Sequence, residues 1–185
     1  IVDFLFGTEW ASTAAEPKFG ILPFILTSVW GMLGASLLGV PVGLMCAVYL
    51  SKVASKRAAG IVRPAVELLS GIPSVVYGLA GMMVLVPAVM DVFNLKNGTC
   101  LLAAILVLAV MILPSIISVS ETALLAVPPE YEEASLALGA SKMETVFKVS
   151  IPAAKSGIAA GIVLGIGRAV GEAMAVMMVA GNVAN

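Results

Sequence analysis

The 185-residue sequence contains no histidine and only two cysteines. Without histidine there is no Ser–His or Cys–His pair, which excludes the hydrolases that depend on such a pair. Cys46 and Cys100 are far apart and lack the short spacing of a zinc or redox motif. We therefore expect no metal site, and we interpret both cysteines as small apolar residues.

Charged residues are also scarce, at 11% of the chain, whereas 61% of the residues are hydrophobic and the mean hydropathy is +1.11. Soluble domains are usually about half apolar, so this composition excludes an ordinary soluble domain. No GxxxxGK[ST] sequence is present, and that loop is the usual cradle for nucleotide phosphates. We expect no ATP hydrolysis by this chain itself.

Long apolar runs are what the sequence has in abundance. They lie near residues 21–50, 65–90, 100–119 and 153–180. About 20 apolar residues in a helix cross the hydrocarbon core, and none of the runs alternates as a barrel strand does. We predict an all-α membrane protein, a polytopic bundle with about four spans within a transmembrane domain at 21–182.

Basic residues indicate how the spans are oriented. Loop 51–64 contains Lys52, Lys56, Arg57 and Arg63, and loop 120–155 contains Lys142, Lys148 and Lys155, against Lys18 and Lys96 on the other side. Because short cytoplasmic loops carry the Lys and Arg excess, we predict that both basic loops are cytoplasmic. Residues 1–20 then form an extracytoplasmic segment with Phe4, Phe6 and Trp10 at the interface, and no removable signal peptide is expected.

Hydroxyl groups recur around a proline in the second run. Ser70, Ser74 and Tyr77 have helical spacing on either side of Pro73. Interrupted helices are tolerated in membranes where neighbouring groups or a water-lined cavity satisfy the freed backbone. Two interpretations stay open for these three residues: they line a route for an oxyanion, or they are ordinary packing residues.

The fourth run carries the charges of greatest interest. At 100° per residue, one helical stripe contains Gly157, Gly161, Gly165, Arg168 and Glu172. Small residues at this spacing let helices approach closely, so the stripe is expected to face protein. A central Arg costs about 2.5–3.5 kcal/mol in a membrane, which a pairing with Glu172 would reduce. The pair is either a structural ion pair or a polar point on an anion route, because the Arg fork matches oxyanions.

A polar segment, PPEYEEASLALGASKMETVFKVSIP, lies between the last two apolar runs at residues 128–152. Prolines and acidic residues at its start predict one short helix. Gly139 ends this helix, and Ser141 with Glu144 has the capping-box spacing that begins a second. We interpret the segment as a compact surface that meets another protein. An amphipathic loop on lipid headgroups would be more basic.

The spacing of this segment resembles the EAA loop of permease subunits of bacterial ABC importers. That pattern has Glu-Ala-Ala, then Gly, then an Ile-x-Leu-Pro ending. Here it reads Glu133, Ala134, Ser135, then Gly139, then Val149 to Pro152, with conservative replacements at Ser135, Val149 and Ile151.

Three further segments resemble the phosphate-specific permeases, and most of all the PstC-type subunit. They are SGIPSVVYG at 70–78, ILPSIISVSETALLAVP at 112–128 and GIGRAVGEAMAVMMVAGN at 165–182. Family subunits usually have more spans than the four expected here, so the chain is similar to their central part, with one further helix expected beyond each end.

The resemblance implies a MetI-like bundle in the cytoplasmic (inner) membrane that imports inorganic phosphate by alternating access. It implies a second, PstA-like permease subunit, an extracytoplasmic phosphate-binding protein and two cytoplasmic ATPase subunits, which bind ATP and Mg²⁺ and leave this chain without a cofactor. It also implies the site residues: Arg168, Glu172, Ser70, Ser74 and Tyr77 for the substrate pathway, and Glu132, Glu133, Ala134, Ser135, Gly139 and Pro152 for ATPase coupling.

Two alternatives to phosphate import stay open. One is import of another oxyanion such as sulfate or molybdate, and the other is a non-transporting membrane scaffold. No nucleic-acid partner is expected.

Overall fold

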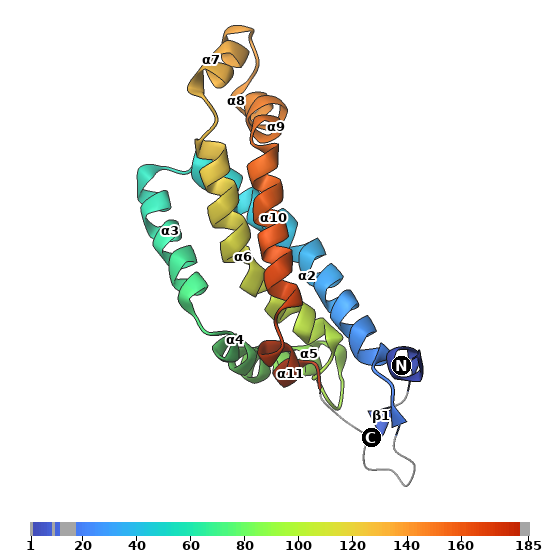
Figure 1. Cartoon of the computed structure of the whole chain (residues 1–185). Coiled ribbons are helices and arrows are strands. Elements are labelled where there is room, and N and C mark those ends of the chain that lie inside the picture. Colours follow the sequence, from blue (N-terminus) through green and yellow to red (C-terminus); the bar gives the residue numbers. More distant parts are fainter. Residues whose placement is uncertain (1, 9, 12–17, 182–185) are drawn as a thin grey trace. The chain divides into compact units, whose positions relative to one another are not determined.

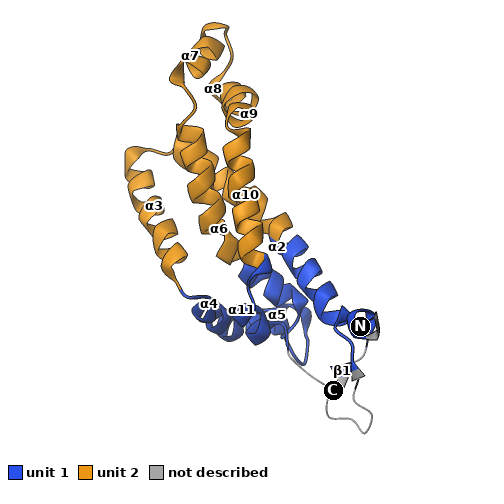
Figure 2. Cartoon of the chain, in the orientation of Figure 1, with its two compact units in different colours: residues 1–35, 73–109, 170–185 blue, residues 36–72, 110–169 orange. Residues whose placement is uncertain are grey.

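The computed structural model describes residues 2–8, 10, 11 and 18–181, and nearly all of its regular structure is helical (Figure 1). The chain divides into two compact units (Figure 2). Unit 1 comprises residues 1–35, 73–109 and 170–185, and unit 2 comprises residues 36–72 and 110–169.

Unit 1 contains short helices around the beginnings of two long ones. Its elements are α1 (Val2–Phe6), β1 (Trp10–Ala11), β2 (Lys18–Phe19), the first part of α2 (Leu22–Val48), α4 (Ser74–Ala80), the π-helical η2 (Gly81–Leu85), α5 (Val86–Phe93), the first part of α6 (Leu101–Leu125) and α11 (Met174–Val179). The two strands pair antiparallel, with Trp10 opposite Phe19. The two rings pack edge to face with their centroids 5.6 Å apart, which stabilises the pairing of the two strands.

The core of unit 1 forms where small residues let helices approach. Its buried members are Val86, Val89, Ala103, Val107, Ala175 and Val179. A Cβ at Gly78 would lie 2.9 Å from the Cα of Ala175, and one at Gly81 would lie 2.5 Å from Val107 Cγ2. Glycine at these two positions therefore permits the close contact of α4 with α11 and of η2 with α6.

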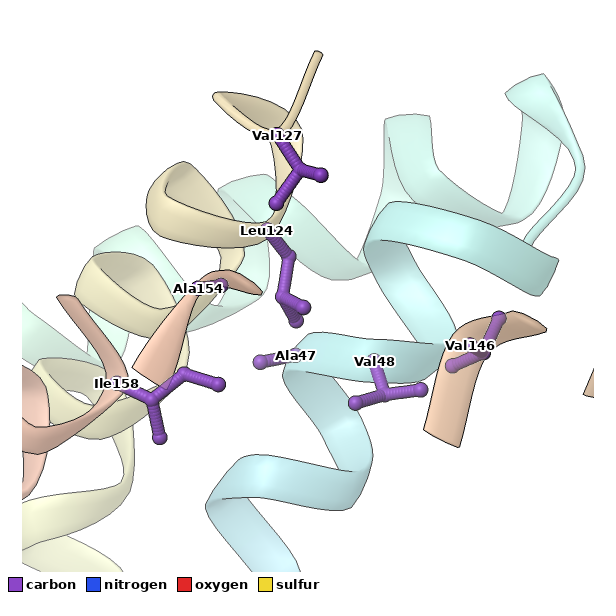
Figure 3. Packing of buried hydrophobic residues seen from close by; sticks show 7 residues of the cluster. All are labelled: Ala47, Val48, Leu124, Val127, Val146, Ala154 and Ile158. Atoms are coloured by element: carbon purple, nitrogen blue, oxygen red, sulfur yellow. The ribbon is translucent and has the colours of Figure 1, made fainter. Parts of the chain in front are cut away.

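Unit 2 contains the ends of the long helices and the polar segment between them. Its elements are the rest of α2, the π-helical η1 (Tyr49–Val53), α3 (Lys56–Gly71), the rest of α6, α7 (Pro129–Ala137), α8 (Lys142–Thr145), the π-helical η3 (Val146–Ser150), α9 (Ile151–Ala153) and α10 (Lys155–Val170). Seven buried residues form its main core: Ala47, Val48, Leu124, Val127, Val146, Ala154 and Ile158 (Figure 3). The end of α2 thus packs against segments on both sides of the polar segment.

The predicted class, an all-α membrane protein, is confirmed. In the part of the chain that the structure describes, three helical stretches are long and apolar enough to cross a membrane: Leu22–Val53, Ser74–Phe93 and Leu101–Leu125. A fourth span exists only if the bent pair Lys142–Ala153 and Lys155–Val170, at 72° to each other, counts as one. The structure therefore agrees with the predicted number of about four spans when the bent pair is counted as one span.

Two of the expected runs are interrupted. Residues 65–71 belong to the amphipathic helix α3, and the backbone is extended at Ile72 (φ −71°, ψ 128°) and Pro73 before α4 begins. Proline lacks an N–H and disfavours helix at the residue before it, which explains the break. Similarly, α10 ends at Val170 and α11 starts at Met174, so the run 153–180 is not one continuous helix.

The glycine stripe on α10 packs on α6, as the small-residue spacing predicted. A Cβ at Gly157 would lie 2.4 Å from the Cβ of Ala123, one at Gly161 would lie 3.1 Å from Ser120 Oγ, and one at Gly165 would lie 2.7 Å from Ile116 Cγ1. Gly161 and Gly165 are buried. The backbones of α6 and α10 are close enough here that any side chain would have to displace its neighbour.

Replacing Gly165 with Val is expected to lower stability by about 1–3 kcal/mol, because overpacking forces the α6 side chains out of place. The matched control is Gly167→Val on the same helix, where a Cβ meets nothing within 4 Å. Thermal unfolding of the purified protein in detergent should show a lower midpoint for Gly165→Val than for Gly167→Val. Equal midpoints would contradict the close packing.

Candidate functional site

The polar segment at 128–152, here called the loop, has the predicted form of two short helices joined at a glycine. Helix α7 starts at Pro129 with Glu130 and Glu132 in its first turn, which suits the positive end of the helix dipole. Gly139 has φ +91°, a conformation that favours glycine, and its N–H donates to the Leu136 carbonyl at 3.0 Å.

The second helix of the loop, α8, begins at the predicted capping box. The Ser141 hydroxyl accepts from the Glu144 N–H at 3.3 Å, and the Glu144 carboxylate accepts from the Ser141 N–H at 3.0 Å. These bonds, together with the nearby Lys148, lower the pKa of the Glu144 carboxyl. The capping-box prediction is confirmed.

Polar contacts hold the loop together, and one of them, from Lys52, binds it to another part of unit 2. Glu132 Oε1 accepts from Lys52 Nζ on η1 and from the Ser150 hydroxyl on η3, the latter at 2.8 Å. The hydroxyl groups of Ser135 and Thr145 are hydrogen-bonded at 2.9 Å, which joins α7 to α8. Ser150 and Thr145 are buried. The loop is therefore fixed to the ends of neighbouring helical segments.

The loop also exposes apolar side chains. Leu138 is 90% exposed at the turn, and Tyr131, Met143 and Phe147 are each more than half exposed. Large apolar side chains gathered in a polar loop are typical of a protein interaction surface. We call these four residues the apolar face of the loop.

The six residues predicted for ATPase coupling include both exposed residues and residues with inward hydrogen bonds. Glu133, Ala134, Gly139 and Pro152 are exposed, whereas Glu132 and Ser135 are half-buried and hydrogen-bonded inward. Sequence reasoning missed Lys52 as a partner of the loop, and it missed Thr145 and Ser150 as hydrogen-bonding residues within the loop. The sequence identified Lys52 only as a cytoplasmic charge, because no local pattern relates positions 80 residues apart.

The electrostatics of Glu132 reflect this inward contact. Burial alone would raise the pKa of the Glu132 carboxyl, but the hydrogen bonds from Lys52 and Ser150 and the Lys52 charge outweigh burial and hold the pKa below its ordinary value. The carboxylate form is therefore the one that the fold stabilises.

A second charged contact joins α3 to α6 within unit 2. Arg63 Nε and Nη2 each lie 2.7 Å from Glu121 Oε1, and the Glu121 side chain is only 10% exposed. A buried carboxylate needs such a partner, because leaving a charge unpaired inside a protein is costly. Nothing local in the sequence pairs these two charges, which are 58 positions apart.

The predicted substrate-pathway residues lie in different surroundings. Glu172 is in the turn after α10, where its carboxylate accepts from the Ala175 N–H at 2.9 Å. The continuous helix expected from Arg168 to Glu172 is wrong, because α10 ends at Val170, and the pairing of these two side chains stays a prediction. Arg168 is half-buried on the last turn of α10.

A cavity of about 550 Å³ in unit 1 has Glu172 in its wall. Most of the residues that line the cavity are apolar, and Thr27 and Ser28 from α2 contribute hydroxyl-bearing side chains to the lining. Of the predicted hydroxyl residues, Tyr77 packs against the unit 1 core and Ser74 is the half-buried first residue of α4, whereas Ser70 is exposed on α3 in unit 2. The helical spacing expected across Pro73 is wrong because the chain is extended there.

Comparisons with known proteins agree on one class. Residues 39–184 match the family model described as "Binding-protein-dependent transport system inner membrane component". The "Probable ABC transporter permease protein YqgH" of Bacillus subtilis is 42% identical over 98% of this chain and 59% of its own length. The "Phosphate transport system permease protein PstC" of Xylella fastidiosa is 37% identical over 98% of this chain and 61% of its own length.

Among solved structures, an inward-facing MetNI methionine ABC transporter chain aligns with a TM-score of 0.67 at 24% identity, covering 82% of this chain and 70% of that chain. At that identity the likeness concerns the fold, and it confirms the predicted MetI-like bundle. The chain spans about three fifths of the length of the curated relatives it matches.

Fold and family model together define a helical, multi-pass transport component of the inner membrane. The chain belongs to the family of binding-protein-dependent transport system inner membrane components.

The contact between Glu132 and Lys52 predicts a pH-dependent stability. Because the folded state lowers the pKa of Glu132, its contribution is present above the ordinary value of 4.5 and is lost as the pH falls through the folded pKa. Glu132→Gln should therefore destabilise the protein by about 1 kcal/mol at pH 7 and by much less at pH 3.5, as measured by thermal unfolding in detergent.

The matched control for this experiment is Glu130→Gln, an exposed residue in the same turn of α7. It should cost little at either pH. If Glu132→Gln lowered the unfolding temperature equally at both pH values, the charged contact would not be the cause.

Proposed function

We propose that this chain is the permease subunit of an ABC importer that moves inorganic phosphate across the inner membrane. The observation that carries the coupling part is the loop, which combines an EAA-type spacing with exposed apolar side chains and an inward hydrogen-bonded carboxylate. The family match supports a transport role, and relatives named PstC, 33–38% identical to this chain, support phosphate as the substrate.

The partners follow from the same proposal. Two cytoplasmic ATPase subunits bind the loops of this chain and of a second permease subunit, and ATP with Mg²⁺ is held by the ATPase subunits. An extracytoplasmic binding protein delivers phosphate. The apolar face of the loop suits a hydrophobic groove on the ATPase, with Leu138 at its most exposed point.

The proposed mechanism is alternating access. ATP binding closes the ATPase pair, the loop moves with it, and the membrane helices open the pathway on the other side. Arg168 offers the planar fork of donors that matches an oxyanion, at a point where charge is otherwise costly. Glu172, in the wall of the unit 1 cavity, limits how tightly an anion is held there.

Arg168 provides the test of the pathway. Arg168→Gln in the assembled transporter should lower phosphate uptake into cells lacking other phosphate permeases by tenfold or more, because the anion loses its charged partner. Lys155→Gln, which removes an exposed charge at the start of the same helix, is the matched control and should leave uptake within twofold. Full uptake with Arg168→Gln would exclude the proposed role. Sulfate and molybdate uptake in the same strain tests the other oxyanions.

Leu138 provides the test of coupling. Leu138→Asp should remove most of the ATPase subunit that co-purifies with the permease, because a charge cannot enter an apolar groove without loss of solvation. Leu138→Met keeps the apolar character and should retain the ATPase. If both variants retained it equally, the apolar face would not be the docking surface, and a non-transporting scaffold would be favoured.

A further inference from the structure

The carboxylate of Glu132 connects three segments that are distant in the sequence. Its Oε1 atom accepts from Lys52 Nζ and from Ser150 Oγ, across separations of 80 and 18 positions. Lys52 lies in η1, which continues α2, and Ser150 lies in η3, which leads through α9 into α10. We call these three residues the Glu132 cluster.

The Glu132 cluster is shielded from water. The Lys52 side chain is 13% exposed, the Glu132 side chain is 27% exposed, and Ser150 is fully buried. Solvent and salt screen partly buried charges less than charges on the surface, so the attraction between Lys52 and Glu132 is stronger than that of a surface pair. Glu133, the next residue along α7, is exposed. Of these adjacent acidic residues, one is bonded inward and the next is open to solvent.

The surroundings of the cluster are unusual for membrane helices. Lys52 and Ser150 both lie on π-helical segments, Tyr49–Val53 and Val146–Ser150, and such segments occur most often at functional sites. Beside them Val48 and Val146 belong to one buried core, as Figure 3 shows. The polar contact is therefore backed by apolar packing between the same two segments.

We propose that Lys52, Glu132 and Ser150 are positioning residues that transmit movement of the loop to α2 and α10 during transport. The inference rests on the proposed function. The three residues hold the loop to the helix ends, so that the loop and the helix ends move together when the ATPase subunits close. The apolar face binds the ATPase, and the Glu132 cluster passes the displacement on.

The first test measures coupling in the assembled transporter reconstituted in liposomes. Lys52→Met and Glu132→Gln should each reduce the number of phosphate ions taken up per ATP hydrolysed at least fivefold. The basal ATPase rate and the amount of bound ATPase should stay within twofold of the unsubstituted complex. Ser150→Ala, which keeps both charges, should give a smaller loss, about twofold.

Two variants control for simple misfolding. Glu130→Gln removes an exposed carboxylate from the same turn and should leave the uptake ratio unchanged. The exchange Lys52→Glu with Glu132→Lys restores an ion pair with reversed polarity, and it should recover at least half of the lost ratio. A merely structural role would change the amount of assembled complex in these variants instead of the uptake ratio.

The second test follows movement and needs no knowledge of the substrate. The two native cysteines, Cys46 and Cys100, are first replaced by Ser. Spin labels are then attached at Met45→Cys on α2 and Ala137→Cys on α7, and both of these positions are exposed. With the Glu132 cluster intact, the distance between the labels should stay narrow and unchanged when ATP and vanadate are added. With Lys52→Met it should broaden or shift.

The outcomes separate this inference from the proposed function. If the label distance is the same in the intact and the Lys52→Met transporters, or if the uptake ratio is unaffected by both charge variants, the inference is wrong. If the intact transporter takes up no phosphate but the label distance responds to Lys52→Met as expected, phosphate is the wrong substrate and the inference stands.

Discussion

The contact of Glu132 with Lys52 and Ser150 is the interaction on which the arrangement of the loop depends. It joins α7 both to η1 and to η3, beside the hydrogen bond between Ser135 and Thr145 that joins α7 to α8. A carboxylate that is only 27% exposed requires neutralisation, and here a lysine from η1 provides it. The need to satisfy one charge therefore acts together with the apolar packing of Val146 to fix the position of the loop.

The loop consequently combines buried polar contacts with exposed apolar side chains. The inward side is polar and hydrogen-bonded, whereas the apolar face carries Leu138, Tyr131, Met143 and Phe147 in exposed positions. A surface of this kind can bind a partner without disturbing its own anchoring. The division also assigns separate tasks to Glu132 and Glu133, although they are neighbours in the sequence.

Much of this could be predicted from local patterns. The membrane class followed from apolar length, the two short helices followed from Gly139 and the capping box, and the contact of the glycine stripe with protein followed from its spacing, whereas α6 as the neighbour came from the structure. These features depend on residues within a few positions of each other, where helix geometry is regular. The helix breaks at Pro73 and after Val170 were harder to predict, because the apolar composition of the sequence continues across both positions.

The tertiary contacts could not be predicted in the same way. Lys52 with Glu132 and Arg63 with Glu121 join positions that are 80 and 58 residues apart, and nothing local in the sequence marks either pair. The helical stripe that placed Glu172 beside Arg168 assumed a continuous helix, and the turn after Val170 removed the basis for it. Patterns predicted the elements, and packing decided which charges meet.

The most direct test of the central claim is an experimental structure of the assembled transporter with its ATPase subunits. The account predicts that Leu138 is buried in a groove of the ATPase while Glu132 remains bonded to Lys52 and Ser150 on the side facing away. A structure in which Glu132 contacts the ATPase, or in which Leu138 remains exposed to solvent, would contradict it.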